Sequence, residues 1–123
     1  MATMEAIVTG HSDGWAFAPA TSGIVNTTTA VTLKAAVAAP TCNYVASLQV
    51  AHDALGGATE LAIRDGAGGA VLWRHKLQTA ANENMTFNFD VPLRGSPGNL
   101  LEVVTFTAVT GGIYINCQGF VAP

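Results

Sequence analysis

Residues 59–77, TELAIRDGAGGAVLWRHKL, decide the fold of this chain. Two runs in this stretch alternate with a period of two, which places successive side chains on opposite faces of a β-strand. Between the runs, residues 65–69 (DGAGG) combine an aspartate with three glycines and can reverse the chain. We therefore predict a β-hairpin, with Trp73 at the centre of the core that its inner face covers. The inner-face residues are expected to be Leu61, Ile63, Val71, Trp73, His75 and Leu77.

The same alternation recurs along the chain from residue 23 onward. Residues 100–109 and 112–121 are expected to form a last antiparallel pair around the turn at 110–112. About seven or eight short strands at a spacing of roughly 8–12 residues are typical of a sandwich. We predict an all-β fold, a single-domain antiparallel β-sandwich that is jelly-roll-like, over residues 23–123. Two further runs are expected to point inward at Tyr44, Ala46, Leu48 and Val50, and at Met85, Phe87, Phe89 and Val91.

Residues 1–22 are predicted to form an extended N-terminal arm. The segment mixes Gly, Pro, Ser and Asp with two lone aromatic residues, Trp15 and Phe17, a composition typical of a loop with anchors. One interpretation is a tail packed on its own domain. The other is an arm that docks on a neighbouring subunit or on a larger assembly, with Trp15 and Phe17 as the contact residues. We favour the second, because ordering such a segment on a monomer costs backbone entropy.

The composition points to a protein that packs against other proteins. Half of the 123 residues are hydrophobic and only 11% are charged, well below the usual ~25%. The formal net charge is −3 and the five basic residues are dispersed, which argues against a nucleic-acid partner. No apolar run approaches the ~20 residues that a membrane helix needs, so no membrane partner is expected. No secretory signal is visible at the N-terminus.

No motif in the sequence indicates catalysis. The histidines, His11, His52 and His75, lack the close spacing of zinc ligands, and no GxSxG elbow is present. The glycines at 66–69 lack the lysine and the following helix of a phosphate-binding loop. We therefore expect no enzyme activity, no cofactor and no metal.

The two cysteines are expected to be buried thiols. Cys42 shares parity with Tyr44 and Leu48, and Cys117 shares parity with Ile113 and Ile115, so both should face the interior. A disulfide between them is the less favoured alternative, because no secretion signal accompanies them.

Seven stretches together resemble a group of small virion proteins of tailed bacteriophages, those of the capsid decoration, or cement, type. Singly, each stretch is only a strand with a turn, but together they span nearly all of the chain after the first dozen residues. They are WAF at 15–17, GIVNTTTAVTLKAA at 23–36, NYVASLQV at 43–50, ELAIRDGAGGAVLWR at 60–74, FDVPLRG at 89–95, NLLEV at 99–103 and YINCQGFV at 114–121.

The resemblance implies a structural protein on the outer surface of a phage capsid, made in the cytoplasm of the host bacterium. Its partner would be the major capsid protein, and it would act as a homo-oligomer, a dimer or trimer, that bridges capsid subunits. The resemblance supplies no catalytic residues. Two other functions are weighed against it: a head-fibre or tail-associated module that binds a host-surface receptor or glycan, and a small virion-associated hydrolase.

Overall fold

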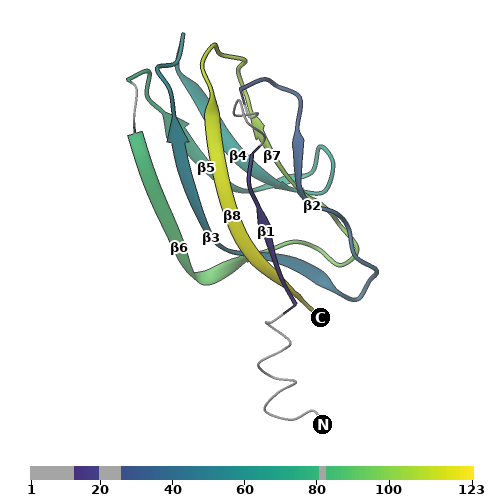
Figure 1. The fold of residues 1–123 in the computed structure, drawn as a ribbon. Helices are drawn as coiled ribbons and strands as arrows, with labels where there is room; N and C mark the ends of the chain where they lie inside the picture. The colour runs from purple at the N-terminus through teal and green to yellow at the C-terminus, as the bar shows by residue number, and fades with distance from the viewer. Residues whose placement is uncertain (1–12, 20–25, 81–82) are drawn as a thin grey trace.

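The computed structural model describes residues 13–19, 26–80 and 83–123, and every regular element in these ranges is a β-strand (Figure 1). This confirms the all-β class. The strands are β1 (Gly14–Phe17), β2 (Val31–Lys34), β3 (Cys42–His52), β4 (Thr59–Asp65), β5 (Ala70–Leu77), β6 (Glu83–Arg94), β7 (Leu101–Thr105) and β8 (Ile113–Ala122).

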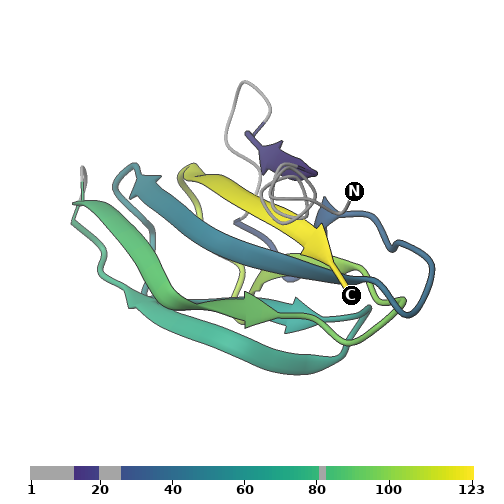
Figure 2. The ribbon, with the colours of Figure 1, turned by 90° about the horizontal axis from the view of Figure 1, so that it is seen from below.

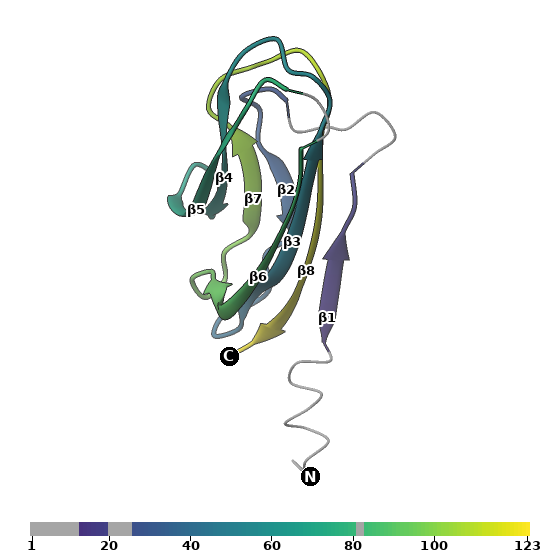
Figure 3. The ribbon, with the colours of Figure 1, turned by 90° about the vertical axis from the view of Figure 1, so that its left-hand side faces the viewer.

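The strands form two four-stranded antiparallel sheets, in the orders β1-β8-β3-β6 and β2-β7-β4-β5. The two sheets lie face to face as the layers of a sandwich (Figures 2 and 3). The hydrogen-bonded pairs include β1 with β8, β2 with β7, β3 with β6 and β4 with β5. Such nested pairing is a long hairpin rolled on itself, which is a jelly roll. The predicted jelly-roll-like sandwich is therefore confirmed.

The hairpin at 59–77 forms as predicted, because β4 and β5 pair antiparallel from Thr59 opposite Leu77 onward. Gly66 and Gly68 in its turn have φ values of 85° and 66°, which favour glycine. Trp73 faces the inside but is only half-buried, because β5 is the outermost strand of its sheet. The centre of the core lies instead among fully buried aliphatic side chains, including Leu48, Leu61, Ile63, Leu101, Val103, Ile113 and Ile115.

Three strand irregularities reverse inward and outward positions that strict alternation predicts. In β5 the ladder passes from Trp73 to Val71 and skips Leu72, so Val71 leaves the inner face and is 39% exposed. In β3 the ladder skips Ala46, so Tyr44 lies on the outer face instead of with Leu48. An extra residue in one strand of a pair shifts every later side chain to the other face.

The third irregularity lies in β6. Asn88 pairs with Ser47 of β3, but the next pair joins Leu93 to Val45, so β6 has extra residues between the two pairs. Residues 89–92 therefore bow out of the sheet. Phe89 still packs against the core, but Val91, predicted inward, is 83% exposed. The prediction was correct for Met85 and Phe87 and wrong for Val91.

The last two strands do not form the expected pair. β7 pairs with β2 and β4, whereas β8 pairs with β1 and β3 in the other sheet. The segment 106–112 is thus a crossover between sheets and not a hairpin turn. Gly111 in this crossover has a φ of 97°, and a side chain there would overlap the carbonyl of Ala54.

Both cysteines are free and buried, as predicted. Cys117 belongs to the core cluster, and burial raises the pKa of its thiol to about 12, so the thiol is protonated at neutral pH. Cys42 is also fully buried, but the bulge at Ala46 puts it on the opposite face of β3 from Leu48. Parity with core neighbours therefore predicts the inward direction of Cys117 alone.

The described part of the predicted arm is a strand and not a loop. β1 adds to the edge of the sandwich beside β8, with Trp15 opposite Gly119 and Phe17 opposite Cys117. Both aromatic side chains pack against the core, and the Trp15 indole Nε1 donates to the Phe120 carbonyl at 3.3 Å. Gly119 is required here, because an added Cβ would overlap the Trp15 ring and the Tyr44 carbonyl.

Candidate functional site

The two histidines that the structure describes, His52 and His75, lie in different settings. His52 is buried and its Nδ1 lies 2.8 Å from the Asp53 carbonyl, whereas His75 stacks on Trp73 at the open edge of the sandwich, with ring centroids 5.9 Å apart. His11 lies outside the described residues. Across the described ranges, no group of three or more His, Cys, Asp or Glu side chains is placed to hold a metal ion.

A polar cluster around Asp65 is structural. Asp65, at the end of β4, accepts bonds from the Ser96 amide at 2.9 Å, the Ser96 hydroxyl at 2.6 Å and the Asn99 side chain at 3.1 Å. Burial alone would raise the pKa of Asp65, but these hydrogen bonds together lower it. The cluster ties the β4–β5 turn to the β6–β7 loop.

The outer faces of the two sheets differ sharply in charge. On the β2-β7-β4-β5 sheet, Arg64 pairs with Glu102 at 2.6 Å, and Arg74 pairs with Glu60 at 2.5 Å. The Arg74 guanidinium also lies 5.1 Å from the centre of the Phe106 ring. The outer face of this sheet is therefore ionic, and two of its charged pairs form within the chain.

The outer face of the β1-β8-β3-β6 sheet carries uncharged polar side chains in three successive cross-strand rows. In the middle row, Gln49 of β3 lies opposite Asn116 of β8 on one side and Thr86 of β6 on the other. We call these three rows the amide face. Its residues are Ser47, Asn88 and Gln118 in one row, Gln49, Thr86 and Asn116 in the next, and Ala51, Asn84 and Tyr114 in the third.

Hydrogen bonds within the amide face orient its side chains. The Ser47 hydroxyl donates to Gln118 Oε1 at 2.8 Å, and Gln49 Nε2 donates to the same oxygen at 3.4 Å. Asn116 and Gln118 are nevertheless exposed. Because each amide group both donates and accepts, the face offers both kinds of hydrogen bond to a partner.

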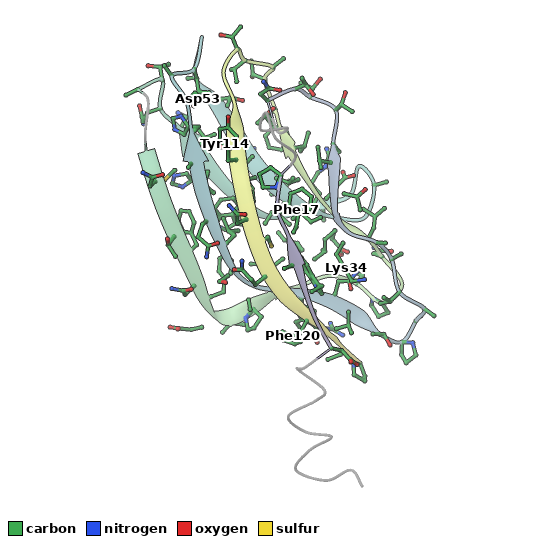
Figure 4. All side chains as sticks on the ribbon, viewed as in Figure 1. Phe17, Lys34, Asp53, Tyr114 and Phe120 are labelled. Atoms are coloured by element: carbon green, nitrogen blue, oxygen red, sulfur yellow. The ribbon has the colours of Figure 1, made fainter. Side chains whose placement is uncertain are left out.

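Aromatic side chains mark the two ends of the amide face. At one end Tyr44 stacks on Phe120, with ring centroids 4.7 Å apart, and the Tyr44 hydroxyl accepts from Arg94 Nε at 3.1 Å. At the other end the Tyr114 hydroxyl donates to Asp53 Oδ2 at 3.4 Å. Figure 4 shows Phe120 and Tyr114 toward opposite ends of β8, with Asp53 beyond Tyr114. At standard strand spacings the surface is about 14 Å wide and about 20 Å long.

The sequence-predicted contact residues are not on this surface. Trp15 and Phe17 lie on the inner face of β1, against the protein's own core, and only the small residue Ala16 borders the amide face, opposite Gln118. The structure thus matches the first interpretation of the arm for residues 13–19. A partner contact through these aromatic residues stays a prediction.

Comparisons with protein-family models, with curated proteins and with solved structures find no match to this chain. In the described ranges, no helix has the length and apolar character needed to cross a membrane.

Proposed function

We propose that this protein is a structural component of a tailed-phage head that binds the outside of the capsid and stabilises it, as a decoration or cement protein. Its partner is the major capsid protein, and it acts by binding and not by chemistry. Two lines of support meet here: the resemblance of seven sequence stretches to virion proteins of this type, and the amide face. The amide face carries the proposal, because it is a broad surface whose three rows contain no charged residue.

An uncharged hydrogen-bonding surface suits a contact with a protein shell. Burying a charge without a partner is costly, whereas an amide or hydroxyl loses little if it finds a hydrogen-bond partner. The stacked pair Tyr44 and Phe120 adds apolar area at one end of the surface. Linked modules that bind neighbouring capsid subunits would bridge them, and multivalency makes the individually weak contacts effective.

A glycan-binding head-fibre or tail-associated module is the second candidate. The same surface favours it, because amide groups beside the Tyr44–Phe120 stack could bind sugar hydroxyls and the apolar side of a sugar ring. The partner that the amide face binds separates the two candidates.

The test is co-sedimentation of the protein with undecorated capsids. The variant Gln49→Glu with Asn116→Asp changes shape very little but puts two charges in the middle row of the amide face. We expect capsid binding to weaken at least tenfold, which is about 1.4 kcal/mol. Wild-type binding should survive raised salt, because salt screens only charged contacts.

The matched control is Gln78→Glu with Thr32→Asp, two exposed positions outside the amide face. This control adds the same charge and should bind like the wild type. Equal binding by all three proteins, or loss of wild-type binding in high salt, would contradict the proposal.

A further inference from the structure

Each sheet of the sandwich ends in edge strands, and three of the four carry a feature that blocks further pairing. β1 and β2 are only four residues long, and β2 also contains an irregularity in its register. β5 presents exposed Arg74 and Lys76. Short edges, bulges and charged side chains are the usual means by which proteins prevent edge-to-edge association.

The fourth edge strand, β6, is blocked over half of its length only. Beyond residue 88 it bows out of the sheet and contains Pro92. The segment 85–89 (MTFNF) keeps a regular ladder with β3 as far as Asn88, and its last residue, Phe89, lies at the start of the bow and still packs against the core. The segment 85–89 has no charged residue and no proline, and it has no bulge as far as Asn88. Among the described strands β6 pairs with β3 alone, so its other side is a sheet edge.

The inner side chains of this segment form part of an apolar seam at the open edge of the sandwich. Met85, Phe87 and Phe89 are each half-buried against the core. Phe87 meets Trp73 and His75 of the opposite sheet edge-to-face, with ring centroids 5.2 Å apart in each case. A strand placed beside β6 would cover the remaining exposed part of this seam.

We propose that the occupant of this edge is residues 85–89 of a second copy of the chain, paired antiparallel about Phe87. In that register Met85 lies opposite the second copy's Phe89 on the inner side, and Thr86 lies opposite its Asn88 on the outer side. Every apolar side chain then meets an apolar one and every polar side chain a polar one. This match follows from the alternation of the segment itself.

The absence of charge in residues 85–89 allows a second copy to approach at this edge. Each chain has a formal net charge of −3, so two copies repel each other, and an uncharged segment is where they approach at least cost. The pairing would join two four-stranded sheets into one of eight strands and place two amide faces side by side. The inference does not depend on the proposed capsid binding, and its test contains no capsid.

The test is sedimentation of the full chain over a range of concentrations. Wild type should show a concentration-dependent dimer. The variant Thr86→Lys with Asn88→Lys places lysine opposite lysine in both outer pairs and should be monomeric at all concentrations. Thr86→Lys with Asn88→Glu places lysine opposite glutamate and should recover the dimer. The control Thr28→Lys with Thr32→Lys adds two charges at exposed positions away from β6 and should dimerise like the wild type.

Circular dichroism establishes that each variant is folded before its mass is compared. A wild-type protein that is monomeric at every concentration, or trimeric, would overturn the inference. So would a dimer that the double-lysine variant retains, because that dimer must use another surface.

Discussion

Asp65 shows how one side chain joins two distant segments. Its carboxylate oxygens accept three hydrogen bonds from Ser96 and Asn99, about 30 residues further along the chain. Only the ionised carboxylate can act as an acceptor on both of its oxygens. The three bonds therefore favour the carboxylate in the folded state and lower the pKa of Asp65.

The lowered pKa predicts an acid-dependent contribution to stability. Because the folded-state pKa lies below the unfolded value of 3.8, the contribution is present above that value and is lost as pH falls through the folded pKa. Asp65→Asn should therefore reduce the free energy of unfolding by about 1 kcal/mol at neutral pH. The effect is small because the carboxylate is partly exposed and solvent screens its interactions. The gap to wild type should close as the pH falls below about 4.

Urea denaturation at several pH values measures this gap. Asp90→Asn, at an exposed position in β6, is the matched control and should show no such gap at neutral pH. A deficit for Asp65→Asn that stays constant down to low pH would show that the hydrogen bonds do not depend on the charge.

At the scale of single residues, alternation in the sequence predicts side-chain direction only as far as the first bulge. Leu61 and Ile63 are buried as expected because β4 is regular over that stretch. Tyr44, Val71 and Val91 are misplaced because each lies beyond an irregularity. A bulge depends on how two strands twist against each other, and a single strand's sequence does not contain that information.

At the scale of strands, the sequence predicts pairing between strands joined by a short turn, but it does not predict pairing between strands that are far apart in the chain. The β4–β5 hairpin is joined by a glycine turn and was predicted at its observed bounds. The pairing of β8 with β1 and β3 connects segments that are far apart in the sequence, so the proximity of β7 and β8 in the sequence suggested the wrong partner. The amide face was missed for the same reason, because its rows exist only once Gln49 lies between Thr86 and Asn116.

The open edge between β5 and β6 gives Trp73 an intermediate energetic role. Its ring is half-buried and contacts Phe87 of the opposite sheet and His75 of its own strand. Full burial of a tryptophan would make its replacement by alanine cost ~3–5 kcal/mol, so we expect Trp73→Ala to cost about 2 kcal/mol. Leu61→Ala, at a fully buried position, should cost at least as much despite removing a smaller side chain.

Denaturant unfolding of the three proteins tests this order, with Val91→Ala as the control for an exposed apolar residue. That control should change stability by less than about 0.5 kcal/mol. A Trp73→Ala loss as small as that of Val91→Ala would mean that the seam contributes nothing to the fold.

At the scale of the whole molecule, the sandwich has two unlike outer faces. One carries paired charges, Arg64 with Glu102 and Arg74 with Glu60, which satisfy each other within the chain. The other is the amide face, whose exposed donors and acceptors can be satisfied by a partner. A module built this way has a direction, with the ionic face suited to water and the amide face suited to the proposed contact with a capsid.

A cryo-EM map of the intact phage particle tests the proposed capsid role most directly. We expect density for the eight-stranded jelly roll on the outside of the head, with the β1-β8-β3-β6 sheet toward the major capsid protein and Gln49 and Asn116 within the contact. A map in which the module is present but the amide face points to solvent, or in which the module is absent from the head, would contradict that role.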